Sequence, residues 1–382
     1  MDFELSNRQK QIRLAVREFA EGELVPIGKE CEAKGEFPRD LIKKAAQLGF
    51  IGCFIKKEYG GLGLGLMEHA IILEEFWRAE PGLAQVLAQP AFGSDILLLY
   101  GTEEQKKKYL PPIAKGDWVM GFSITEPEAG SDAASVTTTA VKDGDEYVIN
   151  GNKVMISNGT EAKFILVFCL TGPEETQKSK RHSIFVVETD RPGYKADRIQ
   201  GKMGLHASDT ANIFFNNVRV PKENLVGVEG NGFSQLIEFL NRSRVIIAAH
   251  AVGLAQGAME QAVNYVKKRK QFGKTIASFQ ITQFKVAEIA TLVETAREIM
   301  YKACWYVDRG TPNAQLSSMA KWWASNVAVR VVDEALQLHG GYGYLDDYPI
   351  ERFYRAAKLL ELYEGTKEIQ KLLIGRQILG VK

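Results

Sequence analysis

The chain has 382 residues, of which 45% are hydrophobic and 25% are charged, a composition typical of a globular protein with a large core. Its 48 basic and 47 acidic side chains give a formal net charge of +1, so no overall field favours nucleic acid or an anionic membrane surface as a partner. The four cysteines stand far apart without CxxC spacing, which excludes a sequence-local zinc or redox site and favours buried thiols in a reducing compartment: Cys31, Cys53, Cys169 and Cys304.

The N-terminal stretch MDFELSNRQKQIRLAVREF is charged and amphipathic from its first residues, unlike the apolar core of a signal peptide. No apolar run in the chain is long enough to span a bilayer. We therefore expect a cytoplasmic protein with no membrane span and no metal centre.

Residues 1–116 are predicted to form a helical domain. Apolar residues recur there at spacings of three and four, as in Ile12, Val16 and Phe19, which places them on one face of a helix. The glycine-rich YGGLGLG and the pair Pro111 and Pro112 are interpreted as breaks between helices.

Residues 117–226 are predicted to form a β domain, because apolar residues alternate with polar ones in VMGFSI, VTTTAV, EYVINGNKVMIS, KFILVFCL, HSIFVVET and ANIFFNNVRV. Short strands separated by turns such as Asp143-Gly144 and Asn150-Gly151 indicate an antiparallel barrel or sandwich.

Residues 227–382 return to the helical period, in long runs rich in Ala, Leu, Gln and Lys whose lengths suit an antiparallel bundle. The order α, then β, then α predicts an α+β fold with two seams between domains. Ligand pockets form preferentially at such interfaces.

Three segments have polar or glycine-rich patterns that suit ligand binding. In FSITEPEAGSD, Thr125 and Ser131 offer hydroxyls at the end of a strand, although a capped acidic turn explains the same residues. In RKQFGKTIASFQ, Arg269 suits a phosphate, or it complements the dipole at a helix C-terminus. In LHGGYGY, Gly340 and Gly341 allow a close backbone approach, or they form a helix cap and turn.

Taken in order, FSITEPEAGSD, NGNKVMISNG, RKQFGKTIASFQ, LHGGYGY and YEGTKEIQ resemble the signature segments of the acyl-CoA dehydrogenases, and VRVPKENLVG agrees with them. The resemblance covers essentially the whole chain. It implies a flavoprotein with an N-terminal helical domain, a central β domain and a C-terminal four-helix bundle. It also implies a homotetramer, built as a dimer of dimers, that holds FAD and an acyl-CoA thioester at the domain seams.

The resemblance assigns residues of several segments to FAD. Met155 stands where the family usually has Trp, but a thioether can also pack on an aromatic face. The segment from Arg269 resembles the one that reaches the FAD of a neighbouring subunit, and Gln337 lies in its companion segment. The cofactor residues so implied are Phe122, Ile124, Thr125, Ser131, Met155, Ile156, Ser157, Arg269, Gln271, Phe272, Gln280, Gln337, Gly340, Gly341, Thr366 and Glu368.

The resemblance also assigns residues to the CoA thioester. LNRSR matches the segment that meets CoA, and Ala356 replaces the acid of the family's usual Arg-Asp-Ala-Lys. The substrate residues so implied are Ser131, Asn241, Arg244, Tyr363, Gly365 and Arg376.

Glu364 is the residue that the resemblance identifies as the catalytic base. Gly365 permits a tight turn, and Thr366 is predicted to cap a helix that buries one face through Ile369, Leu372 and Leu373. Removal of the proton next to a thioester requires a positioned base whose pKa an apolar site raises, and Leu360, Leu362 and Tyr363 are expected to form that flank. A branch of the family places its base instead at the position of Ser243, which carries no carboxylate here.

The function implied is dehydrogenation of an acyl-CoA, with electrons passed to an electron-transferring flavoprotein. An acyl-CoA oxidase, a flavin monooxygenase and a non-catalytic CoA-ester-binding protein are the alternatives. The segment from Gly82 to Leu99 contains no Lys or Arg, which favours an uncharged acyl chain, because an unpaired buried carboxylate is costly. Phe92 and Pro90 favour a short cavity, for short to medium chains including branched or alicyclic ones.

Overall fold

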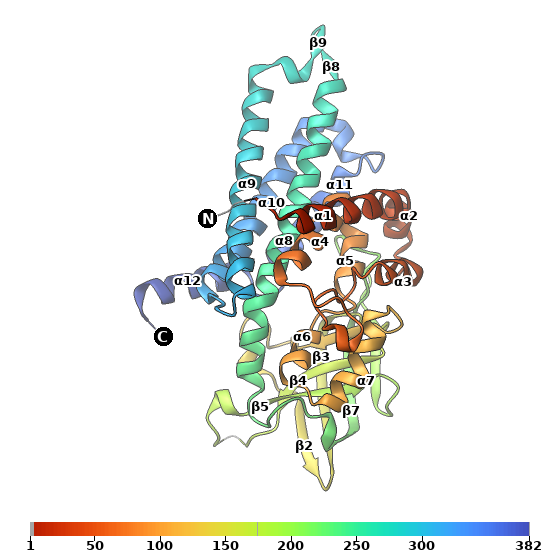
Figure 1. Ribbon diagram of the computed structural model, residues 1–382, viewed down its shortest axis with the longest axis vertical. Helices are drawn as coiled ribbons and strands as arrows, with labels where there is room; N and C mark the ends of the chain where they lie inside the picture. The colour runs from red at the N-terminus through yellow and green to blue at the C-terminus, as the bar shows by residue number, and fades with distance from the viewer. Residues whose placement is uncertain (1–3, 174, 382) are drawn as a thin grey trace.

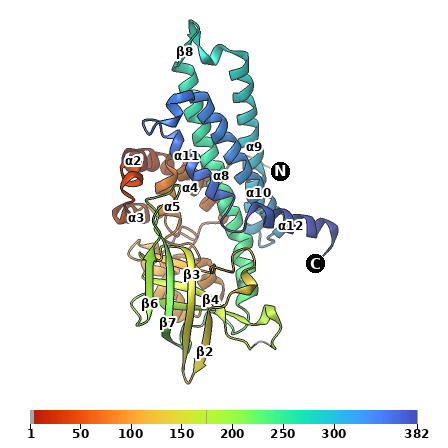
Figure 2. The same cartoon turned by 180° about the vertical axis from the view of Figure 1, so that it is seen from behind.

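The computed structural model describes residues 4–173 and 175–381. The molecule is elongated, with long helices forming one end and strands forming the other, as Figures 1 and 2 show. The shorter N-terminal helices lie between these two ends, against one side of the long helices.

The N-terminal region is helical, as expected. A capping box between Ser6 and Gln9 starts α1, and α7 runs to Ala114 through Pro111 and Pro112, which corrects the predicted break at these prolines. Both prolines lie in the last turns of α7, where the helix ends soon afterwards. The elements are α1 (Asn7–Phe19), the π-helix η1 (Ala20–Leu24), α2 (Val25–Lys34), α3 (Arg39–Gln47), η2 (Lys57–Tyr59), α4 (Leu66–Ala79), α5 (Pro81–Ala88), α6 (Ser94–Tyr100) and α7 (Glu103–Ala114).

The central region is one curled sheet of seven strands in the order β1-β4-β2-β3-β7-β6, with β5 paired to β4. Most pairs are antiparallel, but β1 and β2 each pair with β4 in parallel, which corrects the purely antiparallel prediction. The β2–β3 hairpin separates β1 from β4 in sequence and supplies the crossover that a parallel pair needs. The strands are β1 (Met120–Ser123), β2 (Thr139–Asp143), β3 (Glu146–Ser157), β4 (Phe164–Leu170), β5 (His182–Glu188), β6 (Tyr194–Arg198) and β7 (Thr210–Pro221), with single turns η3 (Ala133–Ser135), η4 (Lys178–Lys180) and η5 (Lys222–Asn224).

One of the two predicted turns in this sheet is present and the other is not. Asp143 pairs with Glu146 across a turn that contains Gly144, which confirms the first. The second, at Asn150-Gly151, is a bulge inside the continuous strand β3. The Asn150 side chain bonds to Asn217 on β7, so the pair kinks the strand and does not reverse it.

The C-terminal region is built on three long helices. α8, α9 and α10 pack together, α11 packs on α8 and α10, and the tip between α8 and α9 carries the short hairpin β8–β9. The bounds are α8 (Gly232–Lys268), β8 (Lys270–Gln271), β9 (Lys274–Thr275), η6 (Ile276–Ser278), α9 (Gln280–Asp308), α10 (Ala314–His339), η7 (Gly340–Tyr344), α11 (Ile350–Leu360) and α12 (Lys367–Leu379). The order of helices and strands agrees with the predicted layout, while the domain boundaries themselves stay predictions.

α12 projects from the body of the molecule, and its packing differs from the prediction (Figures 1 and 2). Thr366 caps it by accepting a hydrogen bond from the N–H of Ile369, as expected. Its buried side chains, however, are Gln370 and Ile374, whereas Leu372 is 46% exposed. Within a single chain only a narrow strip of α12 contacts α10, so most of its apolar residues have no core to enter.

The core runs continuously from the N-terminal helices through α8 and α10 to one face of the sheet. Helices α4 and α8 approach closely because α8 carries glycine at the contact: a Cβ on Gly257 would lie 2.1 Å from the carbonyl oxygen of Arg78. All four cysteines are buried, as expected. Among the described residues, no helix has the length and apolar character needed to cross a bilayer.

Candidate active site

Glu364 lies in the short connection between α11 and α12, and its backbone is unusual. Its φ is 55° and that of Gly365 is 87°, so two successive residues adopt the left-handed region. Glycine does this without strain, but glutamate rarely does. Such a conformation persists only where the surrounding structure holds it, and it is concentrated at functional sites.

Two buried side chains hold this turn. Lys321 on α10 donates from Nζ to the carbonyl oxygen of Gly365 at 2.7 Å. Gln370 on α12 donates from Nε2 to the carbonyl oxygens of Glu364 and Gly365 at 3.1 and 3.0 Å. Both side chains are inaccessible to solvent. The strained turn is therefore anchored from two helices.

The Glu364 carboxylate points toward α8. Ser243 donates from Oγ to Glu364 Oε2 at 2.6 Å. Burial raises the pKa of Glu364 above its ordinary value, while the Ser243 hydrogen bond and the charges of Arg244 and Lys321 oppose that rise. Of the flank expected from the sequence, Leu360 is fully buried but Leu362 is exposed, so the desolvation comes mainly from other elements.

Lys321 and Arg244 are the two cations near this carboxylate. Burial lowers the pKa of Lys321 to about 8, while Glu364 favours its charged form. Burial also lowers the pKa of Arg244, whose Nη1 donates to Asn241 Oδ1 at 3.4 Å. Arg244 Nε is buried without a hydrogen-bond partner among the described residues. The site thus holds polar groups that a ligand could satisfy.

The neighbour of the glutamate, Tyr363, is positioned by aromatic contacts. Its hydroxyl lies 3.0 Å from His250 Nδ1, and His250 stacks on Trp77 with ring centroids 4.8 Å apart. Burial lowers the pKa of His250 to about 3, so this imidazole is neutral. These contacts hold the start of the Glu364 turn against α4 and α8.

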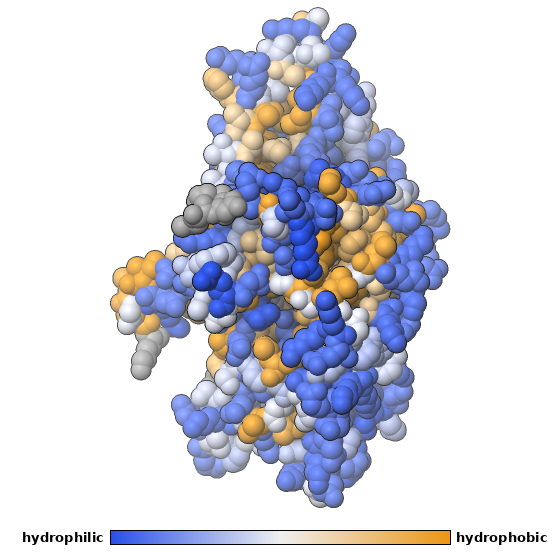
Figure 3. All heavy atoms as spheres, viewed as in Figure 1, coloured by the Kyte–Doolittle hydropathy of each residue, from blue (hydrophilic) through white to orange (hydrophobic). Residues whose placement is uncertain are grey.

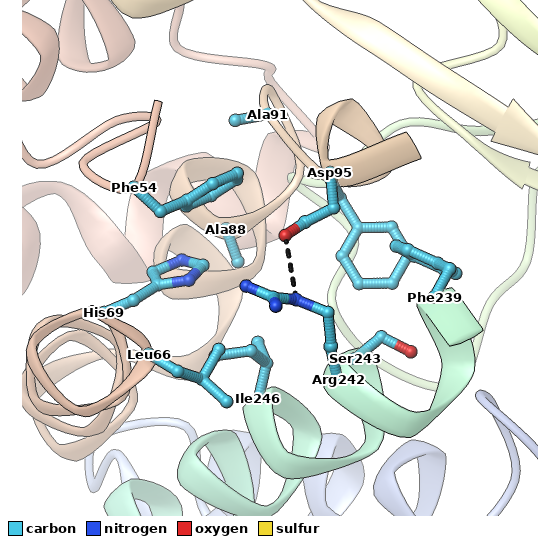
Figure 4. A pocket seen from close by; sticks show the side chains of 11 residues that line it. Phe54, Leu66, His69, Ala88, Ala91, Asp95, Phe239, Arg242, Ser243 and Ile246 are labelled. Carbon is cyan, nitrogen blue, oxygen red and sulfur yellow. Dashed lines mark ion pairs between the residues drawn. The ribbon is translucent and has the colours of Figure 1, made fainter. Parts of the chain in front are cut away.

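A small cavity of about 20 Å³ opens beside Ser243 (Figure 4). Figure 4 shows the Arg242 guanidinium lying between His69 and Asp95, and Arg242 Nε is 3.4 Å from Asp95 Oδ1. Most of the wall is apolar. The lining residues are Phe54, Leu66, His69, Ala88, Ala91, Phe92, Asp95, Phe239, Arg242, Ser243 and Ile246.

Aromatic rings connect this cavity to the sheet. Phe122 on β1 contacts Phe239 on α8, which in turn contacts Phe92, with centroids 5.4 and 5.3 Å apart. Phe122 was expected at the flavin ring and Phe92 at the acyl chain. The structure thus brings one residue of each expected region into contact with Phe239.

The loop after β1 is held by a buried lysine. Lys153 on β3 donates from Nζ to the carbonyl oxygen of Ile124 at 2.8 Å, to that of Phe168 at 2.7 Å and to Glu126 Oε1 at 2.9 Å. The carbonyl oxygen of Thr125 accepts from the N–H of Val154 at 3.0 Å. The expected flavin-contact segments on β1 and β3 therefore lie side by side, and Ser131 is exposed farther along the same loop.

A bulge on β3 turns Met155 outward. The pairing with β7 shifts register between Lys153 and Ile156, and Met155 has φ of 59° and is 71% exposed. Ser157 is partly exposed beyond it. The side chain of Ile156 is buried in the core of the sheet. Only its backbone is left to contact a ligand.

Seven of the remaining expected cofactor residues, Arg269, Gln271, Phe272, Gln280, Gln337, Gly340 and Gly341, lie at the far tip of the long helices (Figure 1), whereas Thr366 and Glu368 lie at the start of α12 beside Glu364. Arg269, Gln271, Gln337, Gly340 and Gly341 line one cavity of about 480 Å³. Outside that cavity Phe272 is 92% exposed with φ of 51°, and Gln280, Glu368 and Arg376 are also exposed. One chain thus presents two separate groups of expected cofactor residues, one on the β1 and β3 segments and one at the helical tip around Arg269.

The sequence reasoning missed five residues at or beside the Glu364 site. Lys321 and Asp95 occur within helical runs in which nothing distinguishes them from surface residues, whereas Gln370 and Arg242 lie in the segments YEGTKEIQ and LNRSR but were assigned no role there. Ser243 was noted only as a position without a carboxylate, although a hydroxyl there is a natural donor to a base on a neighbouring element.

Comparison with known proteins agrees with this architecture. Three family models match, described as the N-terminal domain (residues 6–117), the middle domain (residues 121–218) and the C-terminal domain (residues 230–379) of acyl-CoA dehydrogenase. An acyl-CoA dehydrogenase of Bacillus subtilis (strain 168) is 41% identical over 379 residues, 98% of this chain and 99% of that protein.

Solved structures agree as well. The butyryl-CoA dehydrogenase of Megasphaera elsdenii is 36% identical with a TM-score of 0.95, covering 99% of this chain and 100% of that chain. A chain from a structure described as “Electron transferring flavoprotein of Acidaminococcus fermentans” is 42% identical with a TM-score of 0.96, at the same coverage. The chain belongs to the acyl-CoA dehydrogenase family, whose members are flavin-dependent oxidoreductases that act on acyl-CoA.

Proposed function

We propose that this protein removes two hydrogens from the α and β carbons of an uncharged, short- to medium-chain acyl-CoA thioester, with Glu364 as the base. The observation that carries the proposal is the Glu364 carboxylate, held by Ser243 at 2.6 Å in a site whose burial raises its pKa. A base of this kind is stronger than a solvated glutamate and keeps a defined position. The likeness to a butyryl-CoA dehydrogenase supports the short chain.

The turn at Glu364 provides more than a carboxylate. Its backbone N–H has no protein acceptor among the described residues, and it lies in the connection that Lys321 and Gln370 anchor. That N–H would donate to the thioester carbonyl oxygen as negative charge develops there. Arg244 and Asn241 would meet the polar part of CoA, because the buried Nε of Arg244 has no hydrogen-bond partner in the part of the chain that the structure describes.

The residues fit FAD as the flavin. Met155 is displayed by the β3 bulge one residue after Val154, whose N–H bonds the carbonyl oxygen of Thr125, and it provides an apolar surface with nearby backbone for a flat ring. At the helical tip, a Cβ on Gly340 or Gly341 would meet nothing within 4 Å, so backbone lines the larger cavity beside Arg269. When bound, the flavin accepts the hydride that leaves the β carbon.

The two groups of cofactor residues would be completed by a second copy of the chain. Each lies at a different end of the molecule, so one FAD would use the β1–β3 segments of one subunit and the Arg269 tip of its neighbour. Apolar residues are exposed on α9 and α12, and those of α12 are visible where it projects in Figure 3. We propose a homotetramer with an electron-transferring flavoprotein as electron acceptor, in keeping with the likeness to the Acidaminococcus fermentans chain.

The experiment is a panel of CoA thioesters mixed anaerobically with the purified yellow protein. Bleaching of the flavin absorbance by butyryl-CoA or hexanoyl-CoA is expected, with cyclohexanecarboxyl-CoA as a test of alicyclic chains. Reoxidation by an electron-transferring flavoprotein should outpace reoxidation by oxygen. A colourless preparation, or no bleaching by any thioester, would contradict the dehydrogenase proposal, and rapid oxygen consumption would identify an oxidase.

A further inference from the structure

The cavity beside Ser243 contains an ion pair that the dehydrogenation chemistry does not use. Asp95 comes from α6 and Arg242 from α8, and they meet with Arg242 Nε 3.4 Å from Asp95 Oδ1. The surrounding walls are formed by Phe54, Phe92, Phe239 and other apolar side chains (Figure 4).

The pair is incompletely satisfied. A separation of 3.4 Å exceeds the usual length of a charge-assisted hydrogen bond, and the buried Arg242 Nε makes no hydrogen bond among the described residues, although the Arg242 and Asp95 side chains as a whole are 30% and 19% exposed. His69 adds no charge to the pair, because burial lowers its pKa to about 3, and its ring packs on Phe54. A charged group in an apolar pocket is costly when its hydrogen bonds are not all made. Such a pocket therefore favours a ligand that supplies the missing hydrogen bonds.

The cavity lies where the end of an acyl chain would reach. Ser243 lines it and also bonds Glu364, so its mouth is one side chain from the proposed base. Its volume of about 20 Å³ accommodates roughly one water-sized group. A group that enters it must therefore be small and must sit only a few carbons from the thioester.

Charge balance decides what kind of group fits. Asp95 and Arg242 cancel each other, His69 is neutral, and Glu364 has its own nearby cations, Arg244 and Lys321. A second carboxylate would add an uncompensated negative charge, which is costly in a buried site. A hydroxyl can donate to Asp95 and accept from Arg242 at once.

We infer that the Asp95–Arg242 pair makes the enzyme select acyl-CoA thioesters whose chain carries a neutral hydroxyl at the end that enters this cavity, over plain alkyl chains of equal size. The inference rests on the proposed function and specifies its substrate class. An alkyl end leaves the long ion pair and the Arg242 Nε as they are, whereas a hydroxyl would accept a hydrogen bond from Arg242 and donate one to Asp95.

Isosteric thioesters test it directly. Pentanoyl-CoA and 4-hydroxybutyryl-CoA differ by a methyl against a hydroxyl, as do hexanoyl-CoA and 5-hydroxypentanoyl-CoA. Dissociation constants are measured by calorimetry on the flavin-loaded protein, and flavin bleaching is followed separately. In at least one pair the hydroxyl compound is expected to bind about tenfold or more tightly, because the alkyl compound leaves the buried Arg242 Nε without a hydrogen bond. The double variant Asp95→Leu with Arg242→Met should reverse this preference.

A single charge change gives a second test. Asp95→Asn keeps the shape of the side chain but leaves Arg242 without a counter-charge, so glutaryl-CoA should gain about tenfold or more in affinity relative to pentanoyl-CoA. Asp143→Asn is the matched control, because Asp143 pairs with Arg219 on the exposed surface of the sheet, and it should leave all ratios unchanged.

Each outcome has one meaning. Preference of the wild type for the alkyl member of both pairs, or an unchanged ratio in both the Asp95→Asn and double variants, overturns the inference and leaves the proposed function standing. Absence of bleaching by every thioester contradicts the proposed function, while the calorimetric ratios still decide whether the pair selects a hydroxyl.

Discussion

Ser243 on α8 donates a hydrogen bond to the carboxylate of Glu364, 121 positions later in the chain, at 2.6 Å. By the resemblance, Ser243 stands at the position where a branch of the family places its base, whereas Glu364 is the base proposed here. In this chain Ser243 therefore holds the base by a hydrogen bond and does not supply it. Both positions face the same point of the site, and the hydrogen bond favours the ionised form that accepts a proton.

Glu364→Gln should abolish proton removal while it preserves binding. The amide keeps the size of the side chain but cannot take the α-proton, so flavin reduction should fall by about 10² to 10⁴ in rapid-mixing absorbance measurements. Because the pKa of Glu364 is raised, its ionised form costs stability above the ordinary pKa, and the variant should melt higher than wild type at pH 8. Reduction within about tenfold of wild type would assign the proton to another residue.

Ser243→Ala should move the acidic limb of the reduction rate to higher pH. The Ser243 hydrogen bond lowers the pKa of Glu364, so its loss raises that pKa further and less of the base is ionised at a given pH. The rate near pH 6 should fall, by about tenfold, and recover as the pH rises. Ser234→Ala, on an exposed part of the same helix, is the control. An unchanged limb would show that Ser243 does not tune the base.

Lys321→Met should impair the site through Glu364 as a positioning residue. The Lys321 charge lowers the pKa of Glu364, so its loss should move the acidic limb of the flavin-reduction rate to higher pH. The Lys321 ammonium group also bonds the carbonyl oxygen of Gly365, so its loss should disturb the position of the Glu364 turn. Lys321→Gln keeps a donor without the charge, and it should shift the limb like Lys321→Met but retain more of the rate at high pH. If both variants keep the pH–rate profile of the wild type, Lys321 does not tune the base and only packs in the core.

Arg269→Ala should weaken both assembly and cofactor retention. Arg269 lies over the ring of Tyr342 at 5.3 Å and lines the cavity at the helical tip, which is proposed to serve the neighbouring subunit. Sedimentation velocity and the ratio of flavin to protein absorbance measure the two effects. Lys268→Ala, an exposed cation one residue earlier, should change neither. A tetramer with full flavin content in Arg269→Ala would exclude the shared site.

Lys153→Met should destabilise the sheet and loosen the loop after β1. Burial disfavours ionised Glu126, but Lys153 and the bonds from Thr137 and Thr138 lower its pKa to about 2. Loss of the lysine leaves that carboxylate buried without a counter-charge, at a cost of about 3–5 kcal/mol in urea unfolding. The double variant with Glu126→Gln and Lys153→Met should recover part of the lost free energy of unfolding, because the buried negative charge is then also removed.

The lowered pKa of Glu126 also predicts an acid dependence. The stability that its ionised form contributes is complete above its ordinary pKa and is lost as the pH falls toward about 2. Wild type should therefore lose stability over that range by more than Glu126→Gln does. If wild type and Glu126→Gln lose stability equally as the pH falls, the Glu126–Lys153 ion pair is not the source of the acid sensitivity.

The sequence by itself determined the order of helices and strands, the family, and the turn at Glu364. The spacing of apolar residues and the presence of turn residues are local signals. For this reason β1, β3 and the capped helix α12 could be predicted from the residues within them. The turn at Asn150-Gly151 was wrong because a local signal cannot tell a hairpin from a bulge when a distant strand, through Asn217, completes the pairing.

Only the tertiary structure decided which side chains surround the cavity beside Ser243. The segment from Gly82 to Leu99 contains no basic residue, yet Arg242 enters the same space from α8 and meets Asp95. Lys321 reaches the base from a third element. Periodicity shows that a residue faces the interior but not which neighbour it meets there, because that depends on how helices distant in sequence pack together. The electrostatic character of this site therefore arises from packing and could not be read from any single segment.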